Sequence, residues 1–110
     1  MPKVDITKKA EEEYLVIDES LLKEGEIVKV RIETLKDYAD VDRILQFLRE
    51  GQIIFLRIKE LREKDLTELK RAVEKIKRTC AAIEGDIVGV DEDFIIVTPK
   101  FAKIYRGKST

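Results

Sequence analysis

The sequence offers few side chains that could carry catalysis. It has no histidine, which removes the usual general base near neutral pH and the commonest ligand of transition metals. The single cysteine, Cys80, shares a helical stripe with Val73 and Ile76. We therefore expect a buried thiol with a raised pKa and little nucleophilicity. The two serines, Ser20 and Ser109, lie near the chain ends without a partner base. These residues predict a protein that is not an enzyme.

A cluster of carboxylates at Asp91-Glu92-Asp93 is the candidate for binding a hard cation, because such cations prefer grouped oxygen ligands. A tight turn directs neighbouring side chains outward, however, and the spacing differs from that of a calcium loop. A solvated turn is the favoured interpretation. Gly85 and Gly89 are isolated and form no phosphate-binding loop. We predict no metal and no cofactor.

The composition limits the class of protein. Lys and Arg number 22 and Asp and Glu number 23, so there is no overall surplus of cations to neutralise nucleic-acid phosphates. The absence of asparagine beside dense mixed charge suggests a thermophilic source. No apolar run approaches the roughly 20 residues that cross a bilayer, and the amino terminus does not resemble a secretory signal. A lone cysteine requires no oxidising compartment. We predict a single cytoplasmic domain.

Periodicity predicts an α/β fold of the sandwich type, with a single mixed sheet of about five strands and two helices in the order β-α-β-α-β-β-β. Residues 1–26 form an acidic, partly flexible lead-in that contains the short apolar cluster Tyr14–Ile17. The domain itself is expected over 27–107. Its strands are predicted near 27–33, 52–58, 87–90, 94–97 and 101–106, and its helices from Asp37 to Gly51 and over 63–83.

The strands carry more apolar surface than two helices can hide. Residues 53–56 and 94–97 are apolar on both faces, and a monomer rarely exposes so large a patch. Each large aliphatic side chain sealed from water contributes roughly 1.5–3 kcal/mol. We therefore predict a homodimer or a larger assembly, with Ile54 and Leu56 among the contacts. The alternative is that Tyr14–Ile17 folds back over this face.

The segment from Gly85 to Pro99 resembles the closing part of SepF domains, here in an archaeal-type form. In that family a helix runs into a Gly-Asp-Ile turn and strand, and an acidic turn then leads to an aromatic-led strand and Thr-Pro. Residues 85–87 and 91–99 match this order. The resemblance extends over about residues 12–106, and outside the Gly-Asp-Ile to Thr-Pro stretch it is a likeness of pattern.

The resemblance implies a non-enzymatic cell-division adaptor that self-associates at the septum. Its partner would be the carboxy-terminal tail of FtsZ, which it would link to the membrane. Gly85 matches a family glycine associated with self-assembly. The family commonly begins with a basic amphipathic helix, and Glu11–Glu13 departs from that pattern. Peripheral membrane contact is implied by the resemblance and not by these residues. The residues that the resemblance places around the tail-binding groove are Val90, Phe94, Ile95, Ile76 and Cys80.

Other functions remain open at this stage. A nucleic-acid-binding module, similar to Alba or to the carboxy-terminal domain of translation initiation factor three, would use the basic side of the second helix. A small-ligand sensor of ferredoxin-like type would need a polar pocket that the sequence does not indicate. The basic carboxy terminus would contact acidic lipid or protect a sheet edge. The basic residues concerned are Lys70, Arg71, Lys75, Lys77 and Arg78 on the helix, and Lys100, Lys103, Arg106 and Lys108 at the terminus.

Overall fold

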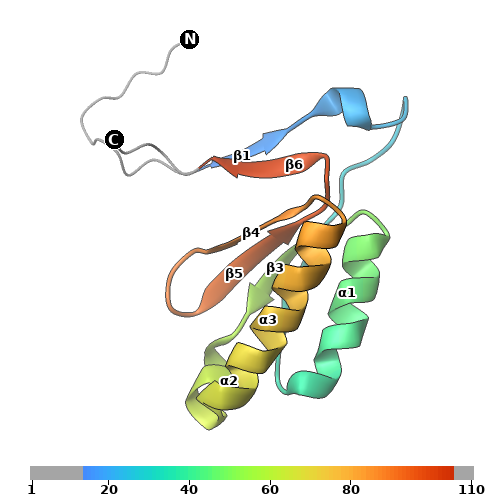
Figure 1. The fold of residues 1–110 in the computed structure, drawn as a ribbon. Helices are drawn as coiled ribbons and strands as arrows, with labels where there is room; N and C mark the ends of the chain where they lie inside the picture. The colour runs from blue at the N-terminus through green and yellow to red at the C-terminus, as the bar shows by residue number, and fades with distance from the viewer. Residues whose placement is uncertain (1–13, 106–110) are drawn as a thin grey trace, which may run out of the picture.

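The computed structural model describes residues 14–105, in which helices cover one face of a sheet and a small two-stranded ribbon lies beside it (Figure 1). None of the helices in this part of the chain is long and apolar enough to cross a membrane. The elements in order are β1 (Tyr14–Ile17), η1 (Glu19–Leu21), β2 (Val30–Thr34), η2 (Tyr38–Asp40), α1 (Val41–Arg49), β3 (Ile53–Arg57), α2 (Lys59–Lys64), α3 (Leu66–Ala82), β4 (Asp86–Gly89), β5 (Phe94–Thr98) and β6 (Ala102–Tyr105), where η denotes a 3₁₀ helix.

The strands form two sheets, so the expectation of a single sheet of about five strands is wrong. The main sheet has four strands in the order β2-β3-β5-β4, with β2 parallel to β3 and the other pairs antiparallel. The last strand, β6, leaves this sheet and pairs with β1, Ile17 lying opposite Ala102. The backbone N–H of Asp18 donates to the carbonyl of Phe101 at 2.7 Å and extends that pairing. The apolar cluster assigned to a flexible lead-in is therefore a strand.

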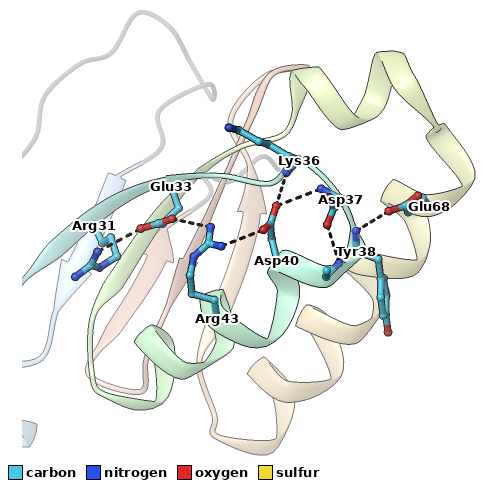
Figure 2. A network of polar contacts seen from close by, with 9 residues as sticks. Arg31, Glu33, Lys36, Asp37, Tyr38, Asp40, Arg43 and Glu68 are labelled. Carbon is cyan, nitrogen blue, oxygen red and sulfur yellow. Dashed lines mark hydrogen bonds and ion pairs between the residues drawn. The ribbon is translucent and has the colours of Figure 1, made fainter.

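The first helix begins as the sequence predicts. The Asp37 carboxylate accepts a hydrogen bond from the N–H of Ala39 at 3.0 Å. The Asp40 carboxylate reaches back to the N–H groups of Lys36 and Asp37, at 2.8 and 3.2 Å (Figure 2). This capping box starts η2, which continues directly into α1. Gly51 closes the helix with a φ of +89°, which glycine adopts readily. The predicted apolar stripe is buried at Val41, Ile44, Leu45 and Leu48.

The second predicted helix, 63–83, is divided into α2 and α3. Asp65 interrupts it with an extended backbone (φ −161°, ψ 91°), and its carboxylate accepts the N–H of Glu68 at 3.0 Å. Asp65 is therefore an N-cap, where aspartate is favoured, and a new helix starts behind it. The helical segment also begins at Lys59, four residues before the predicted start at residue 63, because α2 precedes the break. The chain thus has three α-helices among the described residues, where two were expected.

All three helices contribute to a single hydrophobic core on one face of the main sheet. The alternate residues of β3 and β5 that face this core are Ile54 and Leu56, and Ile95 and Val97. The helical side chains that meet them include Ile44, Leu48, Leu61, Leu69, Ala72, Ile76 and Cys80.

We expect acid to weaken the β2–α1 connection through Asp40. Burial costs its carboxylate some solvation, which raises the pKa, but the hydrogen bonds from Lys36, Arg43 and Asp37 together outweigh this and lower it. A lowered folded-state pKa contributes stability that is present above the unfolded value of about 4 and is lost as the pH falls through the folded-state value.

Asp40→Asn should therefore reduce the free energy of unfolding at pH 7, by no more than about 1 kcal/mol because the pair with Arg43 lies near the surface. The difference from the unmodified chain should shrink as the pH falls below the unfolded-state value and through the lowered folded-state pKa of Asp40. Urea denaturation across that range measures it. A difference that stays constant with pH would contradict this role for Asp40.

Candidate functional site

Strand β2 turns its apolar side away from the helices. On the helix-covered side, the Arg31 guanidinium stacks on the Phe47 ring with 3.8 Å from Cζ to the centroid. Glu33 forms an ion pair with Arg43 of α1 at 3.0 Å (Figure 2). Side chains alternate along a strand, so Val30 and Ile32 point to the opposite face. They are 61% and 58% exposed, a large fraction for aliphatic residues in a sheet.

The face of the main sheet opposite the helices is apolar across its width. Register places Val30 beside Ile53 and Ile32 beside Phe55 on this face. Phe94 of β5 follows, its ring stacked on Phe55 with centroids 4.9 Å apart. We call this surface the open face. Its described residues are Val30, Ile32, Ile53, Phe55, Val88, Phe94 and Ile96, with Arg57 at one end.

The β1–β6 ribbon covers one end of the open face. Ile53 is buried there against Phe101 and Ala102, and Ile17 and Ile96 pack on the same cluster. The N–H of Ile104 donates to the Asp86 carboxylate at 2.9 Å and ties the ribbon to β4. The alternative in which the amino-terminal segment folds back is therefore partly correct. The cover stops short of Val30 and Ile32, which stay exposed.

Two of the residues predicted to bind a tail peptide lie at the other end of the open face. Val90 follows β4 and is 46% exposed. Phe94 is partly buried in its stack with Phe55. Arg62 of α2 stands beside them and forms an ion pair with Asp93 at 3.0 Å. The arrangement combines an apolar, aromatic surface with charged groups at its rim, which suits an amphipathic peptide.

The remaining predicted contacts belong to the interior. Ile54 and Leu56 have no exposed surface, because they lie on the helix-covered side of β3. They therefore offer no side-chain surface to a second copy, in contrast to the expectation from the sequence. Of the predicted tail-binding set, Ile76 and Cys80 of α3 and Ile95 of β5 are likewise buried in the core, so their side chains are not available to a peptide on the surface.

Cys80 is an interior thiol without nucleophilic character. Burial, with a smaller contribution from the Asp86 carboxylate, raises its pKa to about 11. Its Sγ donates to the backbone carbonyl of Asp86 at 3.2 Å. A thiol of this pKa carries almost no thiolate at neutral pH.

Gly85 has a structural role inside the chain. A Cβ at this position would lie 2.1 Å from the backbone carbonyl oxygen of Thr98 and 3.5 Å from Cys80 Sγ. The turn after α3 therefore presses its backbone directly against β5. The resemblance associates this glycine with self-assembly, but the geometry here makes it necessary for the junction of α3, β4 and β5.

The carboxylate cluster forms a turn. The Asp91 carboxylate accepts the N–H of Asp93 at 2.7 Å, which is an Asx turn, and Asp93 faces Arg62. Among residues 14–105, no group of three or more metal-ligating side chains is placed to hold an ion.

The basic side of α3 is partly engaged within the fold. Arg71 stacks on the Tyr38 ring at 4.3 Å, and Lys75 pairs with Asp42 at 2.9 Å. Basic side chains that already contact η2 and α1 in this way are less available to bind phosphates. This observation weighs against the nucleic-acid-binding alternative.

We expect Gly85→Ala to reduce the free energy of unfolding by at least about 2 kcal/mol, because backbone must move to admit the methyl group. Gly89→Ala is the matched control. Nothing lies within 4 Å of a Cβ there and the backbone is unstrained, so its stability should be unchanged or slightly higher. Urea denaturation of both variants decides the point. Equal stability for the two would contradict the close approach.

Comparisons with known proteins agree on a single family. A protein-family model described as cell division protein SepF matches residues 30–104. A SepF-like protein from Archaeoglobus fulgidus aligns over 76% of this chain and 99% of its own, with 28% identity and a TM-score of 0.68. A SepF-like protein from Pyrococcus furiosus aligns over 68% and 90%, with 23% identity and a TM-score of 0.62.

Cell division protein SepF from Methanobrevibacter smithii, solved in complex with FtsZ-CTD, has 22% identity and a TM-score of 0.59 over 66% of this chain and 91% of its own. No curated protein matches the sequence. The matched residues include all three α-helices and all four strands of the main sheet. The chain belongs to the SepF family of cell division proteins.

Proposed function

We propose that this chain is a division adaptor that self-associates through the open face and binds the carboxy-terminal tail of FtsZ. The family membership and the Methanobrevibacter smithii SepF complex with FtsZ-CTD support the partner. The orientation of β2 supports self-association, and it is the observation on which the proposal chiefly depends.

The argument for self-association is energetic. Val30 and Ile32 of β2 are each more than half exposed. Sealing a large aliphatic side chain from water contributes roughly 1.5–3 kcal/mol. Charged side chains could have faced solvent on β2, yet Arg31 and Glu33 are turned toward α1. A second copy placed against this face removes the apolar surface from water.

The argument for tail binding is chemical. A short amphipathic tail needs an apolar surface for its anchoring side chains and charged groups that set its direction. Val90 and the stacked pair Phe55–Phe94 provide the apolar surface. Arg57 and the Arg62–Asp93 pair provide the charged groups.

Linkage to the membrane is part of the proposal through the family alone. Residues 1–13, with the acidic run Glu11–Glu13, lie outside the described residues, as do Arg106 and Lys108. Two basic residues of the carboxy-terminal region are engaged in the fold: Lys100 pairs with Glu84 at 3.1 Å, and Lys103 donates to the Glu84 backbone carbonyl. Lipid contact would therefore depend on the chain ends.

Ile32→Lys should weaken self-association at least tenfold, which corresponds to about 1.4 kcal/mol, because it would place a charge in the apolar contact. Sedimentation at micromolar concentration measures the change. Leu66→Lys is the matched control, because Leu66 is a 50% exposed apolar residue in the helix layer. A monomeric unmodified chain, or an equal effect of the two variants, would contradict self-association through the open face.

Val90→Lys should weaken binding of a synthetic FtsZ carboxy-terminal tail about tenfold, because the tail would lose an apolar anchor. Calorimetric titration should give a micromolar dissociation constant for the unmodified chain and for Leu66→Lys. A flat titration with folded, unmodified protein would refute FtsZ binding. A normal titration with Val90→Lys would place the tail elsewhere.

A further inference from the structure

Strand β2 is an unpaired edge of the main sheet. It pairs with β3 on one side, and among the described residues no strand lies on the other. The N–H of Ile53 donates to the carbonyl of Lys29, and the N–H of Leu35 donates to the carbonyl of Arg57. In a parallel pair, alternate residues direct both backbone groups toward the partner. Val30, Ile32 and Thr34 therefore direct their N–H and C=O groups outward.

Within the described residues, neither proline nor a neighbouring strand protects this edge. Proteins protect exposed edges with proline, bulges, covering elements or charged side chains, including charges that point inward. The strand is five residues long, without proline. Its two charged side chains, Arg31 and Glu33, point inward toward α1, but they have opposite signs and therefore repel a second copy only in some registers. The residues with outward backbone groups are aliphatic or threonine. Such a strand is a template for another extended chain.

We propose that β2 pairs with β2 of a second copy in an antiparallel arrangement centred on Ile32. Ile32 would lie opposite Ile32 of the second copy, and Val30 opposite Thr34. Because all three residues direct their backbone groups outward, every one of these pairs would be hydrogen-bonded, with about six new backbone bonds in all. The two main sheets would become one continuous sheet across a twofold axis.

The charges select this register. Centred on Ile32, Arg31 lies opposite Glu33 of the second copy, and the reciprocal pair forms on the other side of the axis. Opposite charges across an antiparallel pair are favourable. A shift that centres the pairing on Arg31 or on Glu33 would place like charges opposite each other. Within each copy Arg31 and Glu33 form an ion pair at 3.2 Å, and in this register the pair of one copy would lie beside the pair of the other with opposite charges adjacent.

The edge contact leaves the open face free. Paired strands meet through backbone groups in the plane of the sheet, whereas Val30 and Ile32 project perpendicular to it. Two contacts of different kinds on one chain allow assemblies larger than a dimer. The edge contact does not depend on FtsZ binding, so failure of the tail titration would leave it unaffected.

Thr34→Pro is the direct test, because proline removes one outward N–H while its φ remains compatible with an edge strand. Thr34→Val keeps the N–H and is the matched control. Together with the open-face contact of the proposed function, on which this readout rests, edge pairing should give species larger than the dimer in sedimentation over a range of concentrations, for the unmodified chain and for Thr34→Val. Thr34→Pro, shown by circular dichroism to be folded, should need at least tenfold more protein to reach them. Equal assembly of the two variants would overturn the proposal.

Cysteine cross-linking tests the register independently. Ile32→Cys should form an intermolecular disulfide under mild oxidation, because a twofold axis at this residue brings the two cysteines within bonding reach. Val30→Cys should not, since it would face Thr34. The native Cys80 is buried and serves as an internal blank. Cross-linking of Ile32→Cys that persists when Thr34→Pro is added would indicate contact through the open face and overturn edge pairing, as would equal cross-linking at both positions.

Discussion

The contacts between β2 and α1 determine which surface this protein presents. Arg31 lies on the Phe47 ring and donates to Gln52 at 2.9 Å, and Glu33 pairs with Arg43, which also holds Asp40. These contacts orient the charged side of the strand toward the helices. Because side chains alternate along a strand, the same contacts direct Val30 and Ile32 to the opposite face. An apolar surface in water is thus a consequence of a satisfied polar network.

The network also explains how one chain has a closed core on one side of the sheet and an exposed apolar surface on the other. The helix-covered side of the sheet is closed, with Ile54, Leu56 and Ile76 fully buried. The junction of α3 with the sheet is equally close, since Gly85 leaves no room for a side chain against Thr98. The open face is covered only at the end where the β1–β6 ribbon lies. The open face is therefore supported from beneath by a closely packed helix layer.

Much of the fold could be predicted because local patterns carry it. The stripe of Val41, Ile44 and Leu48 predicts α1, Asp37 predicts its start, and Gly51 its end, as the structure confirms. The break at Asp65 was missed because an N-cap between two helices has the same hydrophobic period as one continuous helix. The pairing of β1 with β6 was missed because it joins residues about ninety positions apart in sequence, and no local signal reports such a contact.

By itself, the sequence determined the family, the element types and the presence of more apolar surface than the helices can cover, because these follow from residue type and spacing. It could not determine which residues of each strand face the helices. A strand that is apolar on both sides, such as β3, contains no information on its orientation. In β2 apolar and charged residues alternate, but the alternation does not say which side the helices cover. Only the tertiary structure decided this, since the orientation of β2 depends on Arg43 and Phe47, which reach it from another element.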